Sequence, residues 1–108
     1  MQRNIKFRAW HKNFKSMCPN ITTDLLNRNY LVFMEYTGIN DINNIEIYED
    51  DLICQTSCIN KNKFIGQVKF HQGSWWIDNG IEKKLLYNPN CKNTVTGNYY
   101  EDKFLDTN

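Results

Sequence analysis

YLVFMEYTGINDINNIEIYEDDLI, residues 30–53, is the stretch that decides the fold of this chain. Its first seven residues form a nearly unbroken run of aromatic and branched apolar side chains, which predicts a central β-strand. Thr37 and Gly38 are expected to end that strand, and residues 40–44 are expected to form a polar turn. Short strands should follow at residues 46–48 and 52–54, joined by a turn at residues 49–51.

The rest of the chain repeats this alternation of short strands and turns. IKFRA at residues 5–9 places Ile5, Phe7 and Ala9 on one face of a half-buried strand. Residues 64–70 and 74–77 flank the turn HQG, which predicts a hairpin. A weak strand is expected at residues 84–87, a last strand at residues 95–100 and a short helical piece at residues 23–27.

About seven short strands at intervals of roughly 8–12 residues predict an all-β fold. Short, bent strands with glycine at the corners favour a small SH3-like barrel of antiparallel strands. A chain of 108 residues is long enough for one domain, which we expect over residues 1–101. Residues 102–108 are expected to form a flexible C-terminal tail.

The charge of the chain argues against tight, non-specific binding to nucleic acid. The net charge is +1 and the sequence pI is near 7.6, which is far from a basic footprint. Six basic residues do gather near the N-terminus, where the solvent face of a strand is favoured over a local basic patch; they are Arg3, Lys6, Arg8, His11, Lys12 and Lys15. No apolar run resembles a signal peptide or a membrane span, so a cytoplasmic protein is expected.

Four cysteines are present, namely Cys18, Cys54, Cys58 and Cys91. In a cytoplasmic protein they are expected to be reduced thiols. Cys54-x-x-x-Cys58 could supply half of a zinc site, but the other two cysteines are single and widely spaced. Neither a metal site nor a cofactor is therefore predicted.

The sequence contains no recognisable catalytic motif. Only His11 and His71 could serve as a general base, and no nucleophile elbow, HExxH or phosphate-binding glycine loop occurs. Four acidic residues could hold a hard cation, but a turn whose side chains bond their own backbone explains them more simply; they are Glu46, Glu49, Asp50 and Asp51. A non-enzymatic protein is predicted.

Trp75 and Trp76 are adjacent on an expected strand, so their side chains should point to opposite faces. One should face the core and the other solvent, a partner or a ligand. An outward tryptophan beside Lys69 and His71 could stack on a purine ring, although an oligomer contact is favoured over this alternative. The predicted ligand- or partner-binding residues are Arg8, Trp10, Lys69, His71, Trp75 and Trp76.

Four blocks of the chain resemble YopX-like proteins of phages and prophages. They are IKFRAW at residues 5–10, MEYTGINDINNIEIYEDDLI at 34–53, IGQVKFHQGSWWI at 65–77 and VTGNYYED at 95–102. The blocks occur in the family order and span nearly the whole chain. Asp50 stands where the family commonly has glycine, and aspartate tolerates a left-handed conformation better than most residues.

The resemblance implies a β-rich fold of SH3-like barrel character, a phage or prophage origin and assembly into symmetric oligomers. It implies no catalytic residues. The predicted function is a non-enzymatic phage accessory protein that acts as an oligomeric binding module in the host bacterial cell. It would counteract host defence by sequestering a small nucleotide signal or by binding a host protein. The alternative is a nucleic-acid-binding protein in phage replication or regulation, which the near-neutral charge disfavours.

Overall fold

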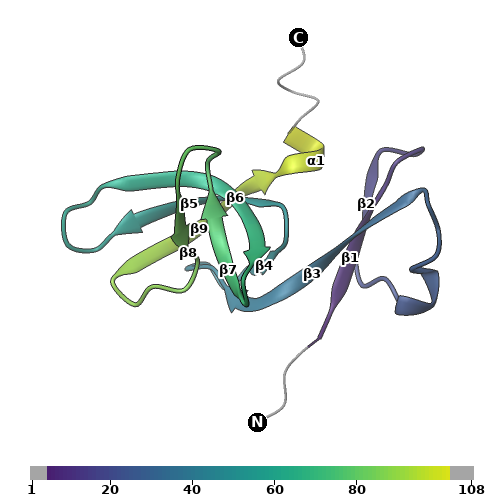
Figure 1. The fold of residues 1–108 in the computed structure, drawn as a ribbon, viewed down its shortest axis with the longest axis horizontal. Coiled ribbons are helices and arrows are strands. Elements are labelled where there is room, and N and C mark those ends of the chain that lie inside the picture. The colour runs from purple at the N-terminus through teal and green to yellow at the C-terminus, as the bar shows by residue number, and fades with distance from the viewer. Residues whose placement is uncertain (1–4, 103–108) are drawn as a thin grey trace.

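The computed structural model describes residues 5–102. Figure 1 shows a curled sheet joined by one long strand to a smaller sheet near the N-terminus. The elements in chain order are β1 (Phe7–His11), β2 (Ser16–Cys18), the 3-10 helix η1 (Thr23–Leu25), β3 (Leu31–Asn40), β4 (Glu46–Tyr48), β5 (Asp51–Ser57), β6 (Lys63–His71), β7 (Ser74–Asp78), β8 (Lys83–Leu85), β9 (Cys91–Asn98) and α1 (Tyr99–Asp102).

The larger sheet has the strand order β8-β7-β6-β5-β9, with every pair antiparallel. It curls into what is called the half-barrel below. Alternation along β6 buries Phe64, Gly66 and Val68 and turns the residues between them outward. Phe64 and Val68 meet Ile47, Ile53, Ile77 and Leu86 in one apolar core.

The smaller sheet has the strand order β2-β1-β3-β4, and β1, β2 and the first half of β3 form the part called the N-terminal lobe below. Phe7 and Phe33 meet edge to face at 6.3 Å between ring centroids. Ala9 and Met34 are fully buried. The predicted strand at residues 5–9 therefore exists but is shifted to Phe7–His11, and Ile5 is exposed.

β3 continues past the point where the sequence predicted its end. It pairs with β1 over Leu31 to Glu35 and then with β4 from Tyr36 onward. Gly38 adopts a φ of +84°, and the register shifts between Tyr36 and Asn40. Gly38 thus forms a β-bulge that bends β3 between its pairing with β1 and its pairing with β4, instead of ending the strand.

The all-β prediction is confirmed, with a 3-10 turn where the short helical piece was expected. The last strand was predicted at residues 95–100, but β9 begins at Cys91 and the chain turns into α1 after Asn98. The cause is local: Asn98 Oδ1 accepts the Glu101 N–H, and Asp102 Oδ2 accepts the Asn98 N–H. The SH3-like comparison and the single domain over residues 1–101 remain predictions. Apart from Asp102, the predicted tail lies outside the described residues.

Neither helical segment within residues 5–102 has the length and apolar character that crossing a membrane requires.

Candidate functional site

Arg8 lies at the junction between the N-terminal lobe and the half-barrel. Its Nη2 atom is 2.8 Å from Asp51 Oδ1 and 3.4 Å from the carbonyl oxygen of Glu49. Its guanidinium carbon lies 4.8 Å from the ring centroid of Tyr48. Only 13% of the Arg8 side chain and 2% of the Asp51 side chain are exposed. Arg8 was predicted to lie on a solvent face or to bind a partner. The solvent-face interpretation is wrong for this residue, because Arg8 forms an ion pair with the buried Asp51.

Asp51 anchors a second contact at this junction. Its Oδ2 atom accepts the backbone N–H of Tyr48 at 2.8 Å. Burial raises the pKa of the Asp51 carboxyl, although Arg8 and the Tyr48 N–H both act to lower it. The predicted turn in which an acidic side chain bonds its own backbone is present here, but the ion pair across the junction accompanies it.

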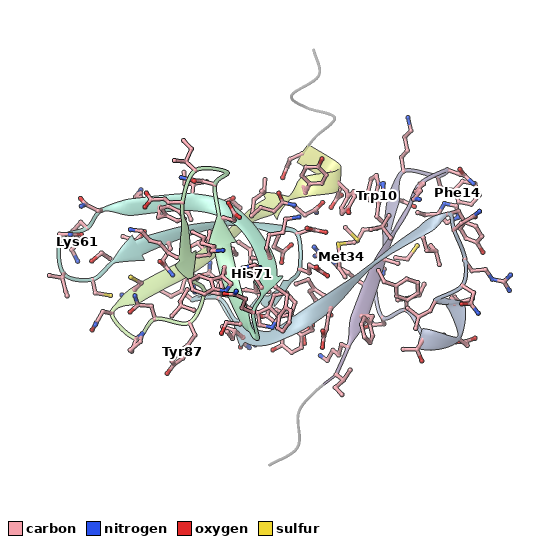
Figure 2. The ribbon with its side chains drawn as sticks, in the orientation of Figure 1. Trp10, Phe14, Met34, Lys61, His71 and Tyr87 are labelled. Atoms are coloured by element: carbon pink, nitrogen blue, oxygen red, sulfur yellow. The ribbon has the colours of Figure 1, made fainter. Side chains whose placement is uncertain are left out.

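Trp10 is also part of this junction. Its side chain is 6% exposed and stacks on Tyr100 of α1, with ring centroids 5.8 Å apart and an interplanar angle of 21°. Figure 2 shows Trp10 on the side of the N-terminal lobe that faces α1. A ring covered in this way is not available to stack on a ligand, so Trp10 holds the two parts of the molecule together.

Asp50 connects three segments around the same junction. Its φ of +70° lies in the left-handed region, which aspartate tolerates better than most residues. The buried carboxylate accepts hydrogen bonds from Gln67 Nε2 at 2.9 Å, Lys69 Nζ at 3.0 Å and Tyr100 Oη at 3.3 Å. Burial and the Asp50 carboxylate raise the pKa of Tyr100 to about 12, so its hydroxyl remains a donor near neutral pH.

The β6–β7 hairpin carries the other four predicted binding residues. Lys69 pairs with Trp76 and His71 pairs with Ser74 across the two strands. Trp75 packs on the core and meets Phe70 edge to face at 5.0 Å. Trp76 lies on the outer face, where its Nε1 donates to the His71 carbonyl at 2.9 Å and Lys83 Nζ lies 5.5 Å from its ring. The predicted opposite orientation of the two tryptophans is present.

A groove on the half-barrel contains one of these residues and several that the sequence did not single out. Two hollows of about 320 and 300 Å³ share Ile39 and Tyr87, and Trp75 and Leu85 line the second. This pair of hollows is called the Tyr87 groove below. Tyr87 is 69% exposed and lies at the lower edge of the half-barrel in Figure 2. The groove is within the size range of small-molecule and peptide sites.

The surface that lines the Tyr87 groove is mostly apolar and carries few charges. Lys92 supplies the only cation among the residues lining it. The one carboxylate, Asp41, is buried and already accepts the backbone N–H groups of Asn43, Ile45 and Val95 at 2.8 to 3.0 Å. Those three bonds outweigh burial, which acts to raise the value, and lower the pKa of Asp41.

Sequence reasoning missed this groove because its walls come from separate parts of the chain. Ile39 follows the β-bulge of β3, whereas Tyr87 follows β8. An exposed tyrosine immediately before Asn88 and Pro89 was the local signal that could have drawn attention to it, since proline favours a loop.

No three His, Cys, Asp or Glu side chains gather to form a metal site within residues 5–102. Cys54 lies in β5 and Cys58 follows it, and both are free thiols, as are Cys18 and Cys91. His11 contacts the rings of Phe14 and Tyr30 in the N-terminal lobe, whereas His71 belongs to the β6–β7 hairpin.

The fold resembles a solved structure, and a family model matches the sequence. No curated protein matches the chain. Among solved structures, protein EF1440 from Enterococcus faecalis superimposes with a TM-score of 0.65 at 19% sequence identity, over 96% of this chain and 99% of that one. At this identity the likeness shows the fold alone. The family model described as YopX protein matches residues 19–105. The chain therefore belongs to the YopX family.

Proposed function

We propose that this protein is a non-enzymatic, phage-encoded accessory protein that acts as an oligomeric binding module in the cytoplasm of the host bacterium. The Tyr87 groove is its protein-binding surface, and an apolar segment of a host protein is the partner that fits this surface. Binding there would counteract a host defence. The observation that carries the proposal is the exposed, largely uncharged groove formed by Ile39, Trp75, Leu85 and Tyr87.

Charge supports an apolar protein segment over a nucleotide in this groove. Lys92 is its single cation, and the Asp41 carboxylate is occupied by three backbone N–H groups. A phosphate would meet too little positive charge there. Tryptophan and tyrosine are enriched at the energetic centres of protein interfaces, because they bury a large area at low conformational cost.

Photo-crosslinking in the producing cell tests this proposal. A benzoylphenylalanine placed at Tyr87 should yield a discrete cross-linked product whose second component mass spectrometry identifies as a host protein. The same probe at Ile81, which is 94% exposed but does not line the groove, is the matched control. A product at both positions, or a product at Tyr87 that contains only this chain, would count against a host partner in the groove.

Nucleic-acid binding is the second candidate function, and the outer face of the β6–β7 hairpin favours it. Trp76 lies there between Lys69 and Lys83, which combines an aromatic face with two cations. Lys69 already bonds Asp50 at 3.0 Å, and the Trp76 indole is held by the His71 carbonyl. Both constraints weaken this candidate. Salt-dependent binding of an oligonucleotide that W76A abolishes would establish it.

A further inference from the structure

Charge is unevenly distributed along this nearly neutral chain. Residues 52–100 contain six lysines and no arginine, but only two acidic residues, Asp78 and Glu82. The acidic residues concentrate instead in residues 35–51, where Lys6, Arg8 and Lys69 pair with three of them. The half-barrel therefore carries a positive charge of its own, although the net charge of the whole chain is only +1.

Part of this positive charge surrounds a pocket at the end of the half-barrel farthest from the N-terminal lobe. The β5–β6 turn and the β8–β9 loop enclose a hollow of about 200 Å³ there, called the barrel-end pocket below. Figure 2 marks this end of the molecule with Lys61. No carboxylate lines the pocket, and its polar side chains are Ser57, Asn60, Asn62, Lys63, Lys84 and Asn88, together with the buried Gln55.

The acceptor atoms of these polar side chains are largely occupied by the turns that contain them. Ser57 Oγ accepts the Ile59 N–H at 3.2 Å, and Asn60 Oδ1 accepts the Asn62 N–H at 2.9 Å. Asn88 Oδ1 accepts the Asn90 N–H at 2.9 Å. Within residues 5–102 the NH₂ groups of Asn60 and Asn88 have no hydrogen-bond partner. The pocket consequently offers several N–H donors, and its remaining side-chain amide acceptors are the oxygens of Gln55 and Asn62.

Neither Lys63 nor Lys84 forms an ion pair with another described residue. Lys84 Nζ instead lies 5.0 Å from the ring centroid of Phe64, which lines the same pocket. Because no carboxylate lines the pocket, no negative charge within it offsets the attraction of the two ammonium groups for an added anion. Amide NH₂ groups beside them can bond several oxygens of that anion.

We propose that the barrel-end pocket binds the phosphate group of a small phosphorylated molecule such as a mononucleotide. Two cations and several N–H donors match a dianion with three terminal oxygens better than they match a cation or an apolar group. The volume accommodates the phosphate and part of the attached molecule, and the remainder extends into solvent. This inference rests on the proposed binding role of the protein but uses a site separate from the Tyr87 groove.

Calorimetric titration at low salt tests the proposal with adenosine monophosphate, inorganic phosphate and neutral adenosine. We expect the monophosphate and inorganic phosphate to bind and adenosine to give no signal. K84Q and K63Q should each weaken the binding by about tenfold, the usual effect of losing one charge-assisted hydrogen bond. K83Q is the matched control, since Lys83 is the neighbour of Lys84 in β8 and contacts Trp76 instead.

Three outcomes would overturn the proposal. The first is no binding of either phosphate compound, and the second is an equal loss of affinity in K83Q and K84Q, which would indicate general electrostatic attraction. The third is binding of the monophosphate that neither K63Q nor K84Q weakens, which would place its site outside the pocket. In the proton–nitrogen spectrum, the side-chain NH₂ signals of Asn60 and Asn88 should shift on titration with phosphate. Cross-linking at Tyr87 is unaffected by any of these results, so the two proposals fail separately.

Discussion

Gln55 Nε2 donates a 3.0 Å hydrogen bond to Asn93 Oδ1 inside the half-barrel, in the gap between its two edge strands. The same Gln55 amide also reaches the Leu85 carbonyl at 3.1 Å, and Asn93 Nδ2 donates to the Leu86 carbonyl at 2.8 Å. The two side chains thus link β9 and β5 to the end of β8, where strand pairing does not close the barrel. Gln55 is only 3% exposed, so water cannot replace these bonds at low cost.

Removing either amide should destabilise the half-barrel. Q55A and N93A should each lower the free energy of unfolding by about 1–3 kcal/mol, because each leaves buried partners unsatisfied. The double variant should lose less than the sum, since both residues belong to one network. Urea unfolding followed by tryptophan fluorescence measures this. K92A, which changes an exposed neighbour in β9, is the control; losses that simply add would show that the two amides act independently.

The buried pair of Arg8 and Asp51 should couple strongly across the junction. R8M leaves the Asp51 carboxylate buried without its cation and should cost about 3–5 kcal/mol in the free energy of unfolding. Adding D51N should recover part of that loss, because asparagine carries no charge and can still accept the Tyr48 N–H. Chemical denaturation of the two variants measures the coupling. A double variant that is less stable than R8M would contradict this account.

Asp41 should make the protein sensitive to acid. Its folded pKa lies below the ordinary value of 3.8, because three backbone N–H bonds outweigh burial. The charged form is thus favoured in the folded state. The stability that the Asp41 carboxylate contributes to folding is therefore present above the unfolded pKa and is lost as pH falls through the folded pKa. Below about pH 4 the stability should decline, and D41N should show less of this decline in denaturation curves measured from pH 6 to pH 2.

D41N should also be less stable at neutral pH. An asparagine side chain has only one oxygen, so its NH₂ group must face either the Val95 N–H or the N–H groups of Asn43 and Ile45. An NH₂ group cannot accept a hydrogen bond from them. We expect a loss of about 1–3 kcal/mol at pH 7. N43Q, which changes an exposed side chain two residues away without adding a titratable group, should leave the acid-dependent part of the curve intact.

Asp50 combines a left-handed backbone with three side-chain bonds, and two substitutions separate these contributions. D50G and D50A both lose the bonds to Gln67, Lys69 and Tyr100. Only D50A retains a Cβ atom at a φ of +70°. D50A should therefore be less stable than D50G by about 1 kcal/mol. Equal stability of the two variants in thermal unfolding would show that the backbone at this position relaxes freely.

Gly66 is required for close packing of β6 on β7. A Cβ atom at Gly66 would lie 2.7 Å from Ile77 Cγ2 and 2.9 Å from the backbone carbonyl of Asp78. Since the backbone cannot rotate out of the way as a side chain can, G66A should cost about 1–3 kcal/mol. I65A, an exposed neighbour in the same strand, is the control for thermal unfolding. A G66A protein as stable as I65A would mean that the two strands separate easily.

The strands were predictable where the side chains alternate over several residues. The β6–β7 hairpin follows directly from the period-two pattern at residues 64–70 and the glycine turn that ends it. The end of β3 was not predictable in the same way, because Thr37-Gly38 has the same local signature whether it ends a strand or forms a bulge. β4 decides between these outcomes by pairing with Tyr36 and Asn40 on either side of Gly38.

The functional surfaces were less predictable than the fold. Local sequence marks Arg8 as a basic strand residue, but only the tertiary structure places Asp51 beside it and buries the pair. Trp10 was predicted for partner contact and instead covers Tyr100. Ile39 and Tyr87, which face one groove, are separated by most of the half-barrel sequence.

By itself, the sequence determined the all-β class and the position of the main hairpin, because both depend on neighbouring residues along the chain. The tertiary structure alone decided that β3 continues past Gly38 as one bent strand, and that β4 joins the smaller sheet whereas β5 joins the larger one. It also decided which charges are paired and which lysines remain free, because those outcomes depend on strands brought together from distant parts of the chain.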